Sequence, residues 1–406
     1  MIYDAIVIGA RCAGASLAML LARQGAKVLL VDRATFPSDI PHGHFIHRHG
    51  PPRLRDWGLL DKVASRTPAI SRMVRDAGDF PLRVGDLVED GVPWGYGPRR
   101  VTFDKILIDA ATGSGAELRE NFSVTGYVSD GDAIAGIRGR HSGGTEVEER
   151  ATITIGADGR RSPLAHAVRA QAYNEVPALL CYYFSYWSGV ESEQFELYTR
   201  TAERRVIFSF KTEDDLYAIF VGAPMEELPV FQRHPEAAFL ASLDLVPDFS
   251  ERVRAGRRAE RFYGATDLPN FYRKPFGPGW ALAGDAGLHK DPYLALGICD
   301  ALRDVEWLAA AIGDGLSGVR PMQDALAAYE RRRNEASSRD YDDNITMARF
   351  TPLRPEVLGL RAAVRNQPQL ATAFTKAVMG MIDRDAFFNP ENLQRVMAGA
   401  ASVERE

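Results

Sequence analysis

The first thirty residues carry a pattern of apolar blocks that predicts a strand, a helix and a second strand. Residues 2–8 are a short run of β-formers, and residues 15–23 are rich in Ala and Leu. Gly25 is placed to end that helix, and residues 27–31 form a second apolar run. This order is typical of a βαβ unit, in which the two strands lie parallel in one sheet.

The middle of the chain changes its pattern twice. Residues 101–111 place apolar side chains on one helical face, and residues 151–157 read as a short buried strand. Aromatic and β-branched residues then alternate with polar turns, which predicts an antiparallel sheet. Its expected strands are residues 182–187, 195–199, 205–211 and 216–221.

The last third of the chain is mainly helical by its pattern. An apolar strand over 280–283 precedes expected helices over 297–312 and 322–340. Beyond about residue 335 the pattern stays helical, with breaks at Pro352, Pro355, Pro368 and Pro390.

Composition narrows the class of protein without changing the expected elements. The chain has 406 residues, of which 46% are hydrophobic and 25% are charged, as expected for a globular enzyme of two or three domains. A net charge of −5 provides no basic field for nucleic acid. Three widely spaced cysteines form no disulfide framework, and no apolar run of about 20 residues appears. We therefore expect a cytoplasmic protein without a membrane span.

The turn after the first strand has the composition of a dinucleotide site. Gly9 permits a tight turn, and Gly14 lets the following helix pack close to the strand. The start of that helix offers N–H groups to a pyrophosphate, and Asp32 is placed to accept hydrogen bonds from ribose hydroxyls. Arg11 replaces the usual middle glycine, so its side chain either pairs with phosphate or points to solvent.

Two further motifs follow strands: Gly156-Ala-Asp158-Gly159, and Gly284-Asp285-Ala286 with Pro292 and Gly297. With these three motifs in order, the chain resembles the single-FAD-domain flavoproteins, which include para-hydroxybenzoate hydroxylase-like monooxygenases, flavin halogenases and geranylgeranyl reductases. The resemblance implies FAD as cofactor. It assigns cofactor contacts to Gly9, Arg11, Cys12, Ala13, Gly14, Asp32, Arg33, Arg100, Val124, Asp158, Gly284, Asp285, Pro292, Gly297 and Ile298.

The same resemblance implies an α/β architecture with a Rossmann-type FAD-binding domain. We assign residues 1–70, 96–170 and 270–334 to that domain, and residues 71–95 and 171–269 to an antiparallel-sheet substrate domain. Residues 335–406 are expected to form a helical C-terminal region. The helix beginning near Gly297 is expected to direct its positive end toward the flavin N1–C2 carbonyl.

Besides Arg11, three positions depart from the family pattern. Ala165 replaces an arginine after the second motif, which puts the contact with a nicotinamide cofactor in doubt. Ala295 replaces a glycine and Cys299 replaces an asparagine in the third motif.

Histidines and aromatic residues supply the candidate pocket. His42, His44, His47 and His49 form two H-x-H pairs, but no carboxylate or cysteine accompanies them at ligand spacing, so we expect no metal. His44, His47 and Tyr293 are the pocket candidates. The aromatic strand 182–187 either walls an apolar substrate site or serves as sheet core, while Lys211 and Arg331–Arg333 are expected to be solvated.

The choice among flavin reactions rests on what the chain contains. One dinucleotide fingerprint indicates that NADPH or NADH would bind only transiently, as in monooxygenases that act on aromatic or polycyclic small molecules. A halogenase W-x-W-x-I-P segment is absent, and the loop from Asp32 to Pro52 contains no lysine. A Y-x-W-x-F-P-like signature of the reductases is also missing. The alternatives are a reductase or dehydrogenase of a carbon–carbon bond, and a non-redox FAD-binding cyclase or binding module.

Overall fold

The computed structural model describes residues 2–40 and 43–403, and its first sheet is built on the expected βαβ unit. Strand β1 lies between β2 and β13, and all three run parallel. β10 extends the sheet beyond β2, and β23 pairs parallel with the end of β13. The bounds are β1 (Ile2–Ile8), β2 (Val28–Val31), β10 (Glu117–Arg119), β11 (Phe122–Asp130), β12 (Ala133–His141), β13 (Val147–Gly156), β22 (Phe276–Gly277) and β23 (Trp280–Leu282). The α/β prediction is confirmed.

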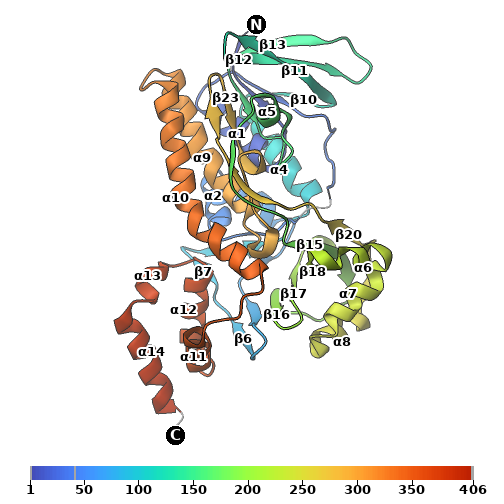
Figure 1. Cartoon of the computed structure of the whole chain (residues 1–406), viewed down its shortest axis with the longest axis vertical. Helices are drawn as coiled ribbons and strands as arrows, with labels where there is room; N and C mark the ends of the chain where they lie inside the picture. The colour runs from blue at the N-terminus through green and yellow to red at the C-terminus, as the bar shows by residue number, and fades with distance from the viewer. Residues whose placement is uncertain (1, 41–42, 404–406) are drawn as a thin grey trace.

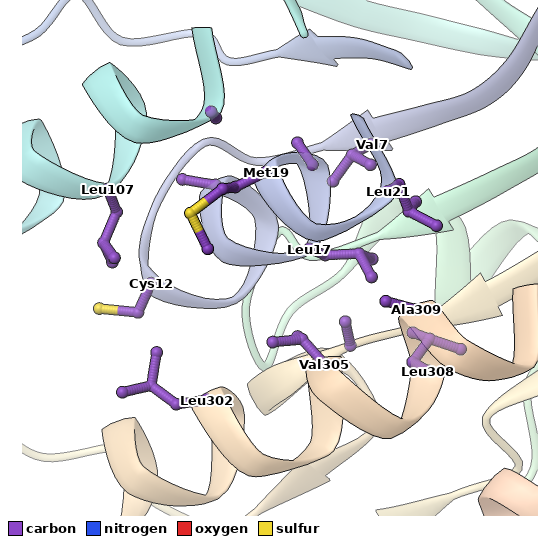
Figure 2. Packing of buried hydrophobic residues seen from close by; sticks show 14 of the residues in the cluster. Val7, Cys12, Leu17, Met19, Leu21, Leu107, Leu302, Val305, Leu308 and Ala309 are labelled. Atoms are coloured by element: carbon purple, nitrogen blue, oxygen red, sulfur yellow. The ribbon is translucent and has the colours of Figure 1, made fainter. Parts of the chain in front are cut away.

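Three helices pack on this sheet through small and branched apolar side chains. Helix α1 (Cys12–Arg23) lies against α4 (Arg100–Gly113) and α9 (Gly297–Leu316). Figure 2 shows Leu17 of α1 facing Val305 and Leu308 of α9. These side chains are fully buried, so the three helices and the sheet share one apolar core. The long helix α10 (Met322–Ala348) runs beside α9 (Figure 1).

A second sheet joins distant parts of the chain. Its strand order is β19-β15-β18-β17-β16-β5-β6, and β20 pairs with β15. β5 and β6 come from a segment more than a hundred residues before β16, and β5 runs parallel to β16. The bounds are β5 (Met73–Asp76), β6 (Pro81–Val84), β15 (Leu180–Ser188), β16 (Phe195–Arg200), β17 (Arg205–Lys211), β18 (Tyr217–Pro224), β19 (Arg257–Arg258) and β20 (Tyr263–Ala265).

Both faces of this sheet are buried, which the alternating pattern did not reveal. In β15, Tyr182, Phe184 and Tyr186 belong to one core, whereas Tyr183 and Trp187 belong to another. The second core is covered by three helices that follow the predicted strands and that we did not predict (Figure 1). They are α6 (Leu228–Arg233), α7 (Pro235–Leu243) and α8 (Pro247–Ala255). Each has at most nine residues, so none carries a long helical period.

The C-terminal region is helical as predicted, and Pro355, Pro368 and Pro390 each begin a helix. The helices are α11 (Pro355–Val364), α12 (Pro368–Val378), α13 (Arg384–Phe387) and α14 (Pro390–Val403). Proline suits the first helical position because its missing N–H has no partner there. Leu360, Val364 and Phe374 enter the same core as Phe184, so these helices pack on the second sheet.

One charge prediction was wrong. We expected Arg331–Arg333 to be solvated. Arg331 and Arg332 are exposed, but the Arg333 side chain is buried between α10 and the three-stranded sheet β14-β21-β24. Its guanidinium donates to the carbonyl oxygens of Gly287 and Arg273 and to the Tyr173 hydroxyl. These acceptors come from segments far away in the chain, so the local run of arginines did not indicate them.

The remaining elements are short connections. They are β3 (Ile46–His47), α2 (Gly50–Asp56), α3 (Leu60–Ala64), β4 (Ala69–Ile70), β7 (Val88–Glu89), β8 (Val92–Pro93), β9 (Gly95–Tyr96), α5 (Pro163–Ala167), β14 (Ala172–Val176), η1 (Glu213–Asp215), η2 (Met225–Glu227), β21 (Asn270–Arg273), η3 (Gly284–Ala286), β24 (Leu288–His289) and η4 (Pro292–Leu294). Among residues 2–40 and 43–403, no helix has the length and apolarity needed to cross a bilayer.

Candidate FAD site

The three glycine motifs meet at the carboxyl ends of β1, β13 and β23. A β-carbon added to Gly9 would lie 2.4 Å from the carbonyl oxygen of Ala157, and one added to Gly284 would lie 2.8 Å from the β-carbon of Ala13. At Gly14, an added β-carbon would lie 1.7 Å from the carbonyl oxygen of Gly9. The glycines are therefore required for the segments to approach each other. The carboxyl edge of such a sheet is where open α/β folds bind ligands.

The first turn presents backbone donors and a fixed carboxylate. Gly9 has φ +102°, a conformation that favours glycine. Arg11 precedes α1 without a side-chain cap, so the amides of the first helical turn remain available to an anion. The Asp32 carboxylate accepts hydrogen bonds from the amides of Ala10 (2.7 Å) and Ala34 (2.8 Å). Asp32 is therefore anchored to the turn itself.

Arg11 has a protein partner that the sequence did not indicate, and its contact with phosphate stays a prediction. Its guanidinium lies 2.7 Å from the Asp104 carboxylate and is 23% exposed. Arg100 binds the same carboxylate at 3.0 and 3.1 Å, and the Cys12 thiol donates to it at 3.3 Å. Two positive charges thus share one buried negative charge beside the start of α1. The surplus positive charge suits a phosphate.

Asp158 is a buried carboxylate in need of a partner. Neither of its oxygens has a hydrogen-bond partner among the described residues. Burial raises the pKa of this carboxyl to about 6. Such a group is costly to bury alone, and a hydrogen-bond donor on a bound molecule would lower that cost.

The third motif places the N-terminus of α9 at the same edge of the first sheet. Ala295 has φ +52°, which explains why glycine is usual there, and Gly297 begins α9. No atom outside the immediate chain lies within 4 Å of a β-carbon added at Gly297, so the amides of this first turn are open to approach. Asp285 and Ile298 are half-buried beside it.

For the other residues predicted to contact FAD, the structure gives the position and burial but no hydrogen bond that bears on the cofactor. Val124 is half-buried on β11, and Arg33 is exposed directly after Asp32. Pro292 begins η4, the short helix before Ala295. The roles of all these residues toward FAD stay predictions.

The histidines separate in the structure, and His42 lies outside the described residues. The ring of His44 lies 3.0 Å from the Tyr186 hydroxyl, and His47 Nε2 lies 3.1 Å from the Leu294 carbonyl oxygen. Burial lowers the pKa of His44 to about 3 and that of His47 to about 4, so both rings are neutral at physiological pH. His47 therefore contacts the segment that precedes α9.

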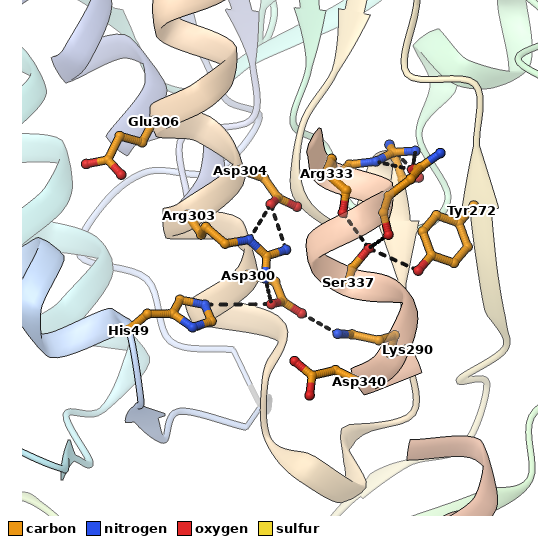
Figure 3. Close-up of polar contacts among 12 residues, drawn as sticks. His49, Tyr272, Lys290, Asp300, Arg303, Asp304, Glu306, Arg333, Ser337 and Asp340 are labelled. Carbon is orange, nitrogen blue, oxygen red and sulfur yellow. Dashed lines mark hydrogen bonds and ion pairs between the residues drawn. The ribbon is translucent and has the colours of Figure 1, made fainter. Parts of the chain in front are cut away.

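Sequence analysis did not predict a buried cluster of charged side chains at the start of α9. Asp300 pairs with Lys290 and Arg303, and His49 Nε2 lies 3.7 Å away (Figure 3). Arg303 also pairs with Asp304 at 2.7 Å. Lys290 and Arg303 hold the pKa of the Asp300 carboxyl well below its usual range, although burial opposes this. The i, i+3 spacing of Asp300 and Arg303 was the available signal.

Asp291 was also missed, and it links the third motif to the second sheet. Its carboxylate accepts hydrogen bonds from the Tyr182 hydroxyl (2.7 Å) and from the amide of Tyr293 (3.0 Å). The Tyr293 hydroxyl in turn lies 3.0 Å from the Thr199 hydroxyl on β16. Burial raises the pKa of Asp291 to about 7. The segment leading to Gly297 is thereby held against the aromatic face of the sheet.

These features fit FAD. The turn after β1 and the surplus positive charge suit its pyrophosphate, and Asp32 is placed beyond the turn where an adenosine ribose would lie. The open first turn of α9 suits a ring carbonyl that gains negative charge on reduction.

Comparison with known proteins agrees with this assignment. Residues 2–221 match the family model described as "FAD binding domain". A digeranylgeranylglycerophospholipid reductase from Methanosarcina acetivorans is 25% identical over 370 residues, which is 88% of this chain and 87% of the reductase.

Two solved structures share the fold at low identity. A myxobacterial chondrochloren halogenase superposes with TM-score 0.78 at 20% identity, over 98% of this chain and 96% of its own. A p-nitrophenol 4-monooxygenase from Pseudomonas putida superposes with TM-score 0.75 at 16% identity, over 94% and 98%.

The halogenase and the monooxygenase are similar in fold alone, whereas the family model covers more than half of the chain. With its three motifs assembled at one edge of the first sheet, the chain belongs to the FAD binding domain family and is an FAD-dependent oxidoreductase.

Proposed function

We propose that this protein is an NAD(P)H-dependent monooxygenase that hydroxylates or epoxidises an aromatic or polycyclic small molecule. The observation that carries the proposal is the contact between the third motif and an aromatic sheet face. In the segment just before α9, the Tyr293 hydroxyl lies within hydrogen-bond distance of the Thr199 hydroxyl on β16. The Asp291 carboxylate in the same segment accepts a hydrogen bond from the Tyr182 hydroxyl on β15. A molecule bound beside this segment would meet that sheet face.

Aromatic side chains of the core that contains Tyr293 lie next to this segment. Phe45, Trp94, Phe195 and Phe210 pack with ring centroids about 5 Å apart, and the His47 ring stacks on Phe45. A flat apolar molecule bound beside them would be oriented by aromatic contacts and kept from water.

Different residues would bind different parts of the cofactor. The amides at the start of α1, with Arg11 and Arg100, would bind the pyrophosphate, and Asp32 would bind the ribose. The first turn of α9 would stabilise negative charge on the ring system. FAD, once bound, supplies the electron transfer and oxygen activation, while the chain supplies orientation and a dry pocket.

A second candidate is a reductase that acts on a carbon–carbon double bond. The digeranylgeranylglycerophospholipid reductase supports it, because that similarity extends over most of both chains. Like the monooxygenase, this reaction needs reduced FAD, but it does not need oxygen.

Flavin reduction and isotope incorporation distinguish the two. The FAD-loaded protein is mixed anaerobically with NADPH or NADH in the presence of a panel of phenols, with 4-nitrophenol as the first probe. Addition of ¹⁸O₂ should then yield a product that carries one ¹⁸O atom. Anaerobic loss of a double bond in an alkene panel would support the reductase instead. If neither nicotinamide nucleotide reduces the flavin with any probe, the NAD(P)H-dependent reaction is excluded.

A further inference from the structure

Residues 47–49 lie against the first turn of α9, the turn assigned to the flavin. The amide of His47 donates to the Cys299 thiol at 3.2 Å, and His49 Nε2 lies 3.7 Å from the Asp300 carboxylate. Cys299 and Asp300 both belong to the first turn of α9. The position of this turn therefore depends on what holds residues 47–49 in place.

Arg48, between the two histidines, connects this segment to the C-terminal helices. Its backbone has φ +56°, a conformation that residues other than glycine adopt rarely and keep only where surrounding contacts fix it. Its guanidinium donates to the Asp340 carboxylate on α10 at 2.6 Å and to the Met379 carbonyl oxygen at the end of α12 at 2.7 Å. The side chain is 14% exposed, so water competes little for these contacts.

Gly380 makes room for the guanidinium of Arg48. A β-carbon added at Gly380 would lie within 2.7 Å of Nε, Cζ and Nη2 of Arg48. Gly380 also has φ +68°, which favours glycine. The turn after α12 is therefore shaped around a side chain that belongs to the start of the chain.

Attachment of the C-terminal helices does not by itself require Arg48. Arg384 pairs with Asp343, which already joins α13 to α10. Arg339 on α10 also pairs with Asp385 of α13. Of these three arginines, Arg48 is the one that lies in the segment beside the start of α9.

We propose that Arg48 is a positioning residue for the flavin: through it, the C-terminal helices hold residues 47–49 against the first turn of α9. The amides of that turn are the donors that would meet the flavin ring carbonyl. If Arg48 is released, residues 47–49 can shift, and the turn that contacts them through Cys299 shifts as well. The inference uses the FAD site alone, so it holds for the monooxygenase and for the reductase.

The first test is Arg48→Met in the FAD-loaded protein. FAD affinity is measured from flavin fluorescence on dilution, and the midpoint potential is measured by reduction against a reference dye. We expect FAD to bind about tenfold more weakly, the scale of one lost charge-assisted hydrogen bond. The midpoint potential should fall, because displaced amides stabilise the reduced flavin less. Arg48→Lys can still pair with Asp340 and should recover part of both losses.

Gly380→Ala separates position from charge. It alters no charged group, but its methyl group must displace the guanidinium of Arg48. It should weaken FAD binding and lower the potential as Arg48→Met does. Gly318→Ala is the matched control, because Gly318 has φ +74° and no described atom lies within 4 Å of its added β-carbon. Arg384→Met, which cuts the other attachment of α13, should also leave both quantities unchanged.

Two results would overturn the inference. If Arg48→Met and Gly380→Ala lower the melting temperature but change neither FAD affinity nor potential, Arg48 only holds the helices together. If Arg48→Met changes the potential and Gly380→Ala does not, the effect comes from the charge and not from the position. Neither measurement needs turnover, so a failure to incorporate ¹⁸O would refute the proposed monooxygenase and leave this role of Arg48 standing.

Discussion

At the scale of single residues, the Asp104 carboxylate provides the counter-charge for Arg11, the arginine that occupies a glycine position in the first turn. Arg11 replaces a glycine, and its guanidinium turns away from the backbone to meet Asp104 on α4. Because Arg100 binds the same carboxylate, the three side chains connect the start of α1 to the start of α4.

Asp104→Asn should therefore destabilise the protein strongly. The carboxylate is fully buried, and its loss leaves two cations without a counter-charge. We expect the free energy of unfolding to fall by about 3 kcal/mol, and FAD retention to weaken, in chemical denaturation of the purified protein. The control is Asp109→Asn on the same helix, whose pair with Lys105 is exposed and should change stability by less than about 0.5 kcal/mol. Equal effects of the two variants would contradict this role of Asp104.

Asp291 should make stability depend on pH. Its pKa is about 7 in the folded protein and 3.8 ordinarily, so the folded state binds the proton more tightly. The contribution is fully present below the ordinary value and is lost as the pH rises through about 7. Asp291→Asn keeps a neutral acceptor at Oδ1, so it should gain stability over wild type by roughly 1 kcal/mol per pH unit across that range.

Denaturation of the FAD-loaded proteins across this pH range checks the Asp291 prediction. Asp324→Asn, which changes an exposed carboxylate at the start of α10, should follow the wild-type profile. Parallel profiles for wild type and Asp291→Asn would show that Asp291 ionises normally.

At the scale of elements, helix α11 is attached to the second sheet by one buried arginine. Arg361 is 1% exposed and binds both oxygens of Asp79 at 2.7 and 2.8 Å. It also donates to the Phe80 carbonyl oxygen, in the turn between β5 and β6. The C-terminal helices are thereby fixed beside this sheet.

Arg361→Met should loosen these helices locally. We expect faster hydrogen exchange in α11 and α12, and a loss of about 1 kcal/mol in the free energy of unfolding, because the exposed Asp79 carboxylate loses its partner but remains hydrated. Hydrogen-exchange mass spectrometry locates the change. Arg339→Met removes an exposed pair with Asp385 and should leave the exchange of α11 unaltered. If exchange instead rises evenly over the whole chain, the attachment is not local.

At the scale of the whole molecule, the FAD site is formed by segments that only the complete fold brings together. Strands β1, β13 and β23 contribute its three turns, and α9 contributes the helix start. Ligand that binds this assembled edge should stabilise the fold as a whole, by about 2.7 kcal/mol at a concentration one hundred times its Kd.

Gly14→Ala tests this dependence. The new methyl group would overlap the Gly9 carbonyl oxygen, so the turn must open and the helix start must shift. We expect a purified protein without yellow colour, and a melting temperature that added FAD does not raise. Gly113→Ala should bind FAD normally, because nothing lies within 4 Å of its added β-carbon. Normal flavin content in Gly14→Ala would refute the close packing of this turn.

Local pattern was sufficient for much of the fold. The βαβ unit, the three glycine motifs, four strands of the second sheet and the helical C-terminal region with its breaks at prolines were predicted, because each depends on neighbours within a few residues. The three helices α6–α8 were not, because each is too short to show a period and prolines separate them.

The sequence by itself determined the motifs and the kind of cofactor they suit. Only the tertiary structure decided which charged groups have partners. Arg11 pairs with Asp104, and the Asp291 carboxylate accepts a hydrogen bond from Tyr182. Arg333 is buried, whereas Arg75 is half-buried with no carboxylate within 4 Å among the described residues. The physical reason is distance along the chain. A turn or a strand follows from adjacent residues, whereas the cost of a buried charge depends on groups a hundred or more residues away.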